Sequence, residues 1–137
     1  MVDASSPVSD AEVLVLYGSV GWSAYTRNPE VLLRAIRNSS FVVTARGASG
    51  ELMGLARTIS DDATVCYLQD ILVNPAFQGA GAGRALLEAV KTRYGHVRQT
   101  VLLTDNEPGQ RAFYQSLGFT EGSDFRPEPL RVFARFR

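Results

Sequence analysis

The chain has 137 residues, 45% of them apolar and 20% charged, which is ordinary for one folded domain with its own core. Its 14 basic and 14 acidic side chains cancel, so no overall field attracts nucleic acid or an anionic membrane. One cysteine and one histidine exclude a zinc site of the usual kind. We therefore expect a single domain over residues 1–137, with no metal, no nucleic-acid partner and no membrane association.

The amino-terminal residues lack the basic and then apolar pattern of a signal peptide, and no apolar run reaches the length of a membrane span. A cytoplasmic protein is therefore expected. Cys66 lies in an apolar run, where a small buried hydrophobe is expected rather than a reactive thiol.

A first helix is predicted after Ser9 or Asp10, either of which could cap it, although the apolar run that follows would also suit a strand. Residues 21–29 predict a loop in which the two aromatic side chains look exposed. Residues 28–38 predict a second helix, capped by Asn28 and with Pro29 at its first position. Its expected apolar face consists of Val31, Leu32, Ala35 and Ile36.

Strands and helices are expected to alternate along the rest of the chain. Residues 41–60 predict a hairpin that turns at residues 47–50, and residues 64–73 predict a third strand. A helix over residues 83–95, a buried strand within residues 97–105 and a helix ended by Gly118 follow.

The last eight residues predict a final strand, because apolar and mostly polar residues alternate. One face would carry Leu130, Val132, Ala134 and Phe136, and the other Arg131, Phe133, Arg135 and Arg137. Together the elements predict an α/β fold, in which helices cover a mixed sheet.

Three glycines, Gly79, Gly81 and Gly83, stand at alternate positions between the third strand and the next helix. They do not fit the dinucleotide fingerprint G-x-G-x-x-G, because Arg84 or Leu86 stands where the last glycine should be. They do not fit the Walker loop either, which needs lysine after its last glycine. What remains is a tight turn whose N–H groups bind an anion at a helix N-terminus, with Arg84 as a possible phosphate contact. A turn that is merely rich in glycine is the alternative.

At this segment the chain resembles a known family. Gln78-x-x-Gly81-x-Gly83, between "ILVNP" and "RALLEAV", is similar to the acetyl-coenzyme A loop of the GNAT superfamily of N-acetyltransferases. "AFYQSLGF", residues 112–119, resembles the late helix and strand of that family. The resemblance covers residues 41–121 and extends to a subgroup with plastid serotonin N-acetyltransferases and small bacterial proteins. "LQDILV" followed by "LLTD" also resembles glucosamine-phosphate N-acetyltransferases. The family fold has a mostly antiparallel central sheet flanked by helices, with a splayed strand pair that holds the cofactor.

The resemblance implies acetyl-coenzyme A as cofactor, with its pantetheine arm paired to the backbone of Ile71, Leu72 and Val73. The Val73 N–H would polarise the thioester carbonyl, and Tyr114 would protonate the departing thiolate. A phenol with a pKa of ~10 can donate to a thiolate whose conjugate acid has a pKa of ~8.5. A packed aromatic in the core is the alternative for Tyr114. The pyrophosphate would be held by the amides of Gln78, Gly79, Ala80, Gly81, Ala82, Gly83 and Arg84.

Asp70 and Asp105 are the candidates for the base that removes a proton from the amine, directly or through water. A carboxylate in an apolar strand is unfavourable without a partner, which makes both residues unusual. A satisfied structural aspartate is the alternative and, for Asp105, a cap on the helix that carries Tyr114. Strand alternation predicts that Asp70 lies on one face of its strand. Tyr67, Gln69, Ile71 and Val73 are expected on the other face.

Trp22, Tyr25, Tyr67 and Gln69 are the candidate acceptor-binding residues, and ordinary packing is the alternative for the aromatic ones. The resemblance favours transfer of acetyl to a small primary amine, either an arylalkylamine or an amino sugar. A non-catalytic acyl-coenzyme A-binding protein is one rival, and an enzyme that acetylates a protein or a tRNA-borne amine is another. The zero net charge argues against RNA. A homodimer through the C-terminal strand or a sheet edge is expected from the family alone.

Overall fold

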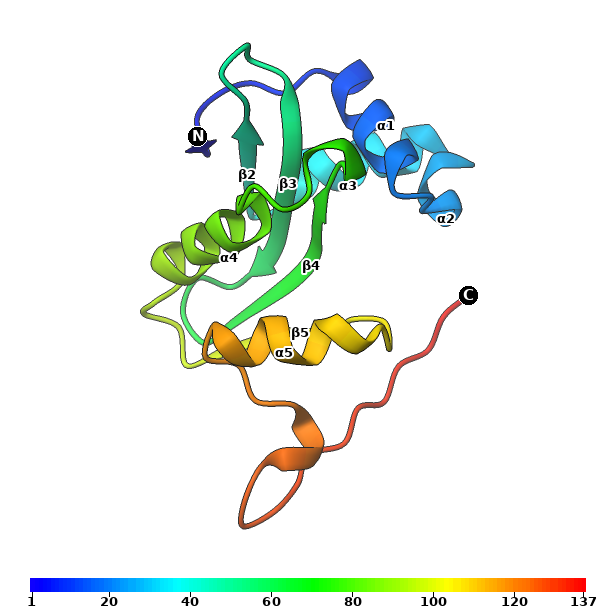
Figure 1. The fold of residues 1–137 in the computed structure, drawn as a ribbon. Helices are drawn as coiled ribbons and strands as arrows, with labels where there is room; N and C mark the ends of the chain where they lie inside the picture. The colour runs from blue at the N-terminus through cyan, green and yellow to red at the C-terminus, as the bar shows by residue number, and fades with distance from the viewer. The chain divides into compact units, whose positions relative to one another are not determined.

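The computed structural model describes residues 1–137, which form two units, residues 1–103 and residues 104–137. Each unit is described by itself. The first is built on a five-stranded sheet whose strands neighbour one another in chain order. Figure 1 shows β2, β3 and β4 side by side. The strands are β1 (Val2–Asp3), β2 (Phe41–Arg46), β3 (Leu52–Ser60), β4 (Val65–Val73) and β5 (Gln99–Leu102). The first three pairings are antiparallel and β4 pairs with β5 in parallel, so the predicted mixed, mostly antiparallel sheet is confirmed.

The helices of the first unit are α1 (Asp10–Ser19), α2 (Ser23–Thr26), α3 (Pro29–Asn38) and α4 (Ala82–Arg93), with a short 3₁₀ helix, η1, over Pro75–Phe77. Leu55 of β3 packs in a core cluster with side chains of α1 and α3. At the neighbouring Gly54, a side chain would instead meet Leu86 of α4. Because successive strand residues point to opposite faces, α1 and α3 cover one face of the sheet and α4 covers the other.

The predicted starts of α1 and α3 are confirmed, but α3 and the segment before it differ from the prediction in detail. Ser9 caps α1 in a capping box with Glu12, which decides between the helix and the strand. Pro29 begins α3, but the Asn28 side chain makes no capping hydrogen bond. Within α3, Leu32 is fully buried while Val31 is 45% exposed, so the expected apolar face is narrower than predicted. The segment before α3 is the short helix α2 rather than a loop, and its two aromatics are half-buried.

The second unit holds α5 (Pro108–Ser116) and a 3₁₀ helix, η2 (Gly122–Asp124). Gly118 has the left-handed backbone, with φ of 91°, that the predicted helix end requires. Arg111 of α5 pairs with Glu121 at 2.8 Å and with Asp124 at 2.5 Å, which fastens the η2 turn to the helix.

The predicted final strand over residues 130–137 is wrong for the chain as it stands. These residues are exposed and belong to no strand. Alternation gives a segment two faces, but a strand also needs a hydrogen-bonding neighbour, and β5 pairs with β4 alone. The strand predicted within residues 97–105 is also shorter than expected, since β5 has four residues and none is fully buried.

One irregularity in the sheet places the site. Arg57 of β3 pairs with Asp70 of β4, but the next β3 residue, Thr58, pairs with Leu68. Gln69 is therefore an extra residue, a β-bulge, and the strand changes face across it. The predicted alternation is consequently wrong on one side of the bulge, because cross-strand partners share a face. Tyr67 pairs with Ile59 and lies on the α1 and α3 face with Asp70, whereas Ile71 and Val73 lie on the α4 face.

Candidate functional site

The end of β4 has an open edge that begins at the bulge. Pairing with β5 ends at Leu68 and Leu102, so no strand pairs with residues 69–73 on that side. The Asn74 N–H donates to the Met53 carbonyl at 2.8 Å, and backbone groups of an antiparallel strand alternate in direction. The backbone N–H and C=O groups of Leu72 therefore point to β3, whereas those of Ile71 and Val73 point to the open edge.

The glycine turn that follows leads directly into the N-terminus of α4. Gly79 and Gly81 have φ of 86° and 83°, a left-handed backbone that favours glycine, and a Cβ at either would meet nothing within 4 Å. Gly81 is the N-cap of α4, which has neither a side-chain cap nor an acidic residue in its first turn. The first N–H groups of a helix have no intrahelical acceptor, and the macrodipole adds partial positive charge. The turn is therefore suited to hold an anion.

The four candidate acceptor-binding residues lie on the face of the sheet opposite α4. The Tyr25 hydroxyl accepts a hydrogen bond from Gln69 Nε2 at 3.1 Å. The rings of Trp22 and Tyr25 lie 6.1 Å apart between centroids. Tyr67 is half-buried on the same face, where burial and then the charge of Asp70 raise the pKa of its phenol. The structure thus brings Tyr25 into contact with both Trp22 and Gln69 and places Tyr67 on the same face of the sheet.

The Asp70 carboxylate is buried and held by three donors. Arg57 Nε donates to its Oδ2 at 2.6 Å, and the Tyr17 hydroxyl donates to the same oxygen at 3.0 Å. The Tyr25 hydroxyl donates to Oδ1, also at 3.0 Å. The side chains of Arg57 and Asp70 are only 7% and 4% exposed. Asp70 therefore has the partner that a buried carboxylate needs.

Sequence reasoning missed Arg57 and Tyr17 as members of this cluster. Arg57 is a charged residue inside the apolar strand β3, a signal that could have paired it with Asp70. Tyr17 lies on the buried side of α1 with Val13 and Leu16, where an aromatic residue is expected whether or not its hydroxyl has a task.

Tyr114 and Asp105 belong to the second unit. Burial, together with the negative charge of Asp105, raises the pKa of the Tyr114 phenol, so the phenol is protonated at neutral pH. Asp105 Oδ1 accepts hydrogen bonds from the Glu107 N–H at 3.1 Å and from Gln110 Nε2 at 3.2 Å. Asp105 therefore contacts the residues around the start of α5, but α5 has no side-chain cap, so the predicted capping role of Asp105 is wrong.

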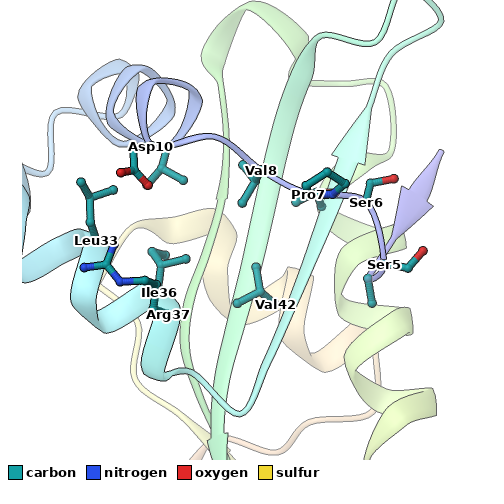
Figure 2. Close-up of a pocket in the computed structure, with 12 residues that line it drawn as sticks. Ser5, Ser6, Pro7, Val8, Asp10, Leu33, Ile36, Arg37 and Val42 are labelled. Carbon is teal, nitrogen blue, oxygen red and sulfur yellow. The ribbon is translucent and has the colours of Figure 1, made fainter.

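A cavity of about 350 Å³ lies away from these residues, between the amino-terminal segment, α1, α3 and β2 (Figure 2). Val8, Leu33, Ile36 and Val42 give it apolar walls, and none of the predicted site residues lines it.

No helix in the chain is both long and apolar enough to cross a membrane. The cytoplasmic location remains a prediction.

Comparison with known proteins agrees with this geometry. The family model described as an acetyltransferase (GNAT) domain matches residues 37–121, which is more than half of the chain. An uncharacterised N-acetyltransferase, ycf52, of the red alga Pyropia yezoensis is 28% identical over 82% of this chain and 66% of its own length. A chloroplastic GCN5-related N-acetyltransferase of Arabidopsis thaliana is 33% identical over 76% of this chain and 47% of its own length. A histone acetyltransferase, TAP1, of Glycine max is 31% identical over 79% of this chain and 50% of its own length. The chain thus spans between about half and two thirds of these relatives.

Solved structures agree as well. A GNAT-family acetyltransferase of Streptococcus pneumoniae superimposes with a TM-score of 0.80 at 26% identity, covering 99% of this chain and 98% of that one. Glucosamine-6-phosphate N-acetyltransferase of Arabidopsis thaliana superimposes with a TM-score of 0.65, covering 100% of this chain and 98% of that one. At 12% identity, this likeness shows a shared fold alone. With a bulged strand whose edge opens before a glycine turn, and with a family match over most of that region, the chain belongs to the GNAT superfamily of acetyltransferases.

Proposed function

We propose that the chain is an N-acetyltransferase that moves an acetyl group directly from acetyl-coenzyme A to the primary amine of a small molecule. The observation that carries this proposal is the continuity of the open β4 edge with the glycine turn and the uncapped start of α4. A GNAT domain generally uses acetyl-coenzyme A as acyl donor, which supports this reading.

The residues at this edge fit acetyl-coenzyme A on two grounds. The backbone groups of Ile71 and Val73 are directed to an edge with no strand, where an extended chain carrying amides could pair. The first turn of α4 contains no acidic residue and no side-chain cap, so its amides suit a pyrophosphate. When bound, the cofactor supplies the acetyl group as a thioester. The Val73 N–H would donate to the thioester carbonyl oxygen, and residues 78–84 would hold the phosphates.

On the amine side we propose Trp22, Tyr25, Tyr67 and Gln69 as acceptor-binding residues. Three aromatic rings and an amide on one face suit an arylalkylamine, whose ring can pack against them while its amine is hydrogen-bonded. An amino sugar remains the second small-molecule acceptor to be tested. A protein lysine is the third, because one relative is named a histone acetyltransferase.

Proton transfers are assigned to the second unit. Tyr114 would protonate the leaving thiolate, since its raised pKa keeps the hydroxyl protonated. Asp105 is the better candidate base, because its Oδ2 accepts none of the bonds that occupy Oδ1. Asp70, whose two oxygens accept three donors, is the poorer one.

The test is thermal unfolding with and without acetyl-coenzyme A, followed by thiol release over a panel of arylalkylamines, amino sugars and lysine peptides. Ligand at ~100 times its Kd should stabilise the chain by about 2.7 kcal/mol. Tyr114→Phe should slow thiol release without removing that stabilisation. Tyr94→Phe, which deletes a hydroxyl on the α4 face, is the matched control. Stabilisation without turnover on any amine would favour the non-catalytic acyl-coenzyme A-binding protein, and no stabilisation would refute the cofactor assignment.

We also propose that two copies exchange their C-terminal segments. Leu130, Val132, Phe133 and Phe136 are between 55% and 89% exposed in a segment with strand alternation. The sheet ends at β5, whose outer edge has no strand, so the segment of one copy could extend the sheet of the other. Light scattering should give twice 14.9 kDa, and Val132→Lys with Phe136→Lys should return it to 14.9 kDa. A wild-type chain of 14.9 kDa in solution would contradict exchange between copies.

A further inference from the structure

The cluster around Asp70 joins four elements at one carboxylate. Arg57 comes from β3, Asp70 from β4, Tyr17 from α1 and Tyr25 from α2. The rings of Tyr17 and Tyr25 meet edge to face, with centroids 5.4 Å apart. Every donor in this set lies on the face of the sheet that carries the proposed acceptor-binding residues. The cluster therefore fixes where α2 lies on β4.

The hydroxyl of Tyr25 has a defined hydrogen-bonding pattern. It has one proton, and Asp70 Oδ1 accepts it at 3.0 Å. The hydroxyl oxygen then accepts from Gln69 Nε2 at 3.1 Å and, more weakly, from Arg57 Nη2 at 3.4 Å. Burial and the negative charge of Asp70 raise the pKa of Tyr25, so the hydroxyl keeps its proton at neutral pH.

This pattern sets the orientation of the Gln69 amide. Its NH₂ group is directed to Tyr25, so its carbonyl oxygen Oε1 must point elsewhere. Oε1 accepts no bond from the chain, and no buried side-chain oxygen or nitrogen lacks a partner. Oε1 is therefore not fully buried, and Gln69 as a whole is half-buried. Oε1 also belongs to the bulge residue, at which the open edge of β4 begins.

We propose that Asp70 is a positioning residue: through Tyr25 it holds the Gln69 amide so that Oε1 accepts a hydrogen bond from the amine nitrogen of the acceptor. This rests on the proposed N-acetyltransferase function and deepens it. Gln69 then contacts the substrate, whereas Asp70 acts through another residue and does not take the proton. Both Asp70 oxygens are engaged, one of them by a guanidinium at 2.6 Å, which leaves the carboxylate poorly placed for proton transfer.

The test measures KM and kcat for 2-phenylethylamine, together with the melting temperature shift caused by acetyl-coenzyme A. Tyr25→Phe frees the Gln69 amide and should raise the amine KM about tenfold, the worth of one hydrogen bond, with kcat and the acetyl-coenzyme A shift little changed. Gln69→Ala should raise the KM similarly. The double variant should be no worse than Gln69→Ala alone, because Tyr25 acts through Gln69. Tyr94→Phe, as the matched loss of a buried hydroxyl, should leave the amine KM unchanged.

Asp70→Asn separates positioning from base catalysis if it folds. Positioning predicts a higher amine KM and an unshifted dependence of kcat on pH, whereas a lost base predicts a collapse of kcat. That collapse, an unchanged KM in Tyr25→Phe, or additive effects in the double variant would each overturn the proposal. A wild-type chain that is stabilised by acetyl-coenzyme A but turns over no amine would overturn it too, leaving the cofactor assignment standing. Absence of stabilisation would overturn both.

Discussion

Gly54 is where the packing of the sheet can be tested most directly. It lies in β3 beside the end of β4, and its backbone is not left-handed. A Cβ at this position would lie 2.8 Å from the Leu72 carbonyl oxygen, 3.1 Å from Leu86 Cδ1 and 3.3 Å from Val73 Cγ2. The first contact is with backbone, which cannot turn aside. Gly54→Ala must therefore shift β4 or α4.

Two opposing terms decide the sign of the change in stability. Alanine restricts the unfolded chain and alone would stabilise by about 0.4–1 kcal/mol. Overpacking a fitted interior costs roughly 1–3 kcal/mol. The contact with backbone places Gly54→Ala toward the upper part of that range, so we expect a net loss of about 1–2 kcal/mol. At about 4 °C per kcal/mol, the melting temperature should fall by roughly 4–8 °C.

Thermal unfolding of Gly54→Ala and Gly18→Ala measures the effect. Gly18 lies in α1 with nothing within 4 Å of its Cβ position, so alanine there should stabilise by about 0.5–1 kcal/mol. Because Val73 lies at the open edge, Gly54→Ala should also lessen stabilisation by acetyl-coenzyme A. A melting temperature that is unchanged or raised in Gly54→Ala would refute the close approach of β3, β4 and α4.

Three further changes test other parts of the first unit. A hydrogen bond from Arg46 and one from the Ser9 N–H lower the pKa of Glu12 to about 2. The ionised Glu12 therefore stabilises the folded chain fully above its unfolded pKa of about 4.3, and this stabilisation is lost as the pH falls toward 2. Glu12→Gln keeps the capping box and should lower the free energy of unfolding by about 1 kcal/mol at pH 7, a figure kept small because Glu12 is 35% exposed. At pH 2 the substitution should change the free energy of unfolding by almost nothing. Urea unfolding at the two pH values checks this. Tyr94→Phe removes the partner of the buried Thr58 hydroxyl, 2.9 Å away, and should cost about 1–3 kcal/mol, much of which Thr58→Val should restore in a thermal double-mutant cycle. Gly81→Ala must adopt a φ of 83° and should lose about 1–2 kcal/mol in thermal unfolding as well as affinity for acetyl-coenzyme A by calorimetry.

Much of the fold could be predicted because its signals are local. The capping box at Ser9 and the proline at position 29 mark helix starts through contacts within a few residues. Gly79, Gly81 and Gly118 occupy left-handed positions that sequence reasoning associates with turns and helix ends. The C-terminal segment fails for the complementary reason. Its alternation is local, but pairing depends on a neighbour that no local pattern specifies.

The site was only partly predictable, because the bulge leaves no trace in the burial of β4. Buried and half-buried residues alternate without interruption from Val65 to Val73, as they would in a regular strand. The buried residues nevertheless change face: Leu68 is opposite Thr58 on the α4 side, and Asp70 is opposite Arg57 on the other. A hydrophobic pattern indicates which residues are buried but not on which face of the sheet they lie. The bulge is therefore revealed only by the register in which β3 and β4 pair.

The bulge also explains how Asp70 can be buried in an apolar strand. If Gln69 were paired as in a regular strand, alternation after Leu68 would turn Asp70 toward α4, whose packed side chains Leu86, Leu87 and Val90 offer no donor. Because Gln69 forms the bulge instead, Asp70 faces Arg57 and two tyrosine hydroxyls. Gln69 also stands where pairing with β5 ends and the strand edge opens. The bulge at Gln69 therefore turns the buried carboxylate of Asp70 toward its donors and places an amide at the start of the proposed cofactor edge. It ties the stability of this face of the sheet to the geometry of the site.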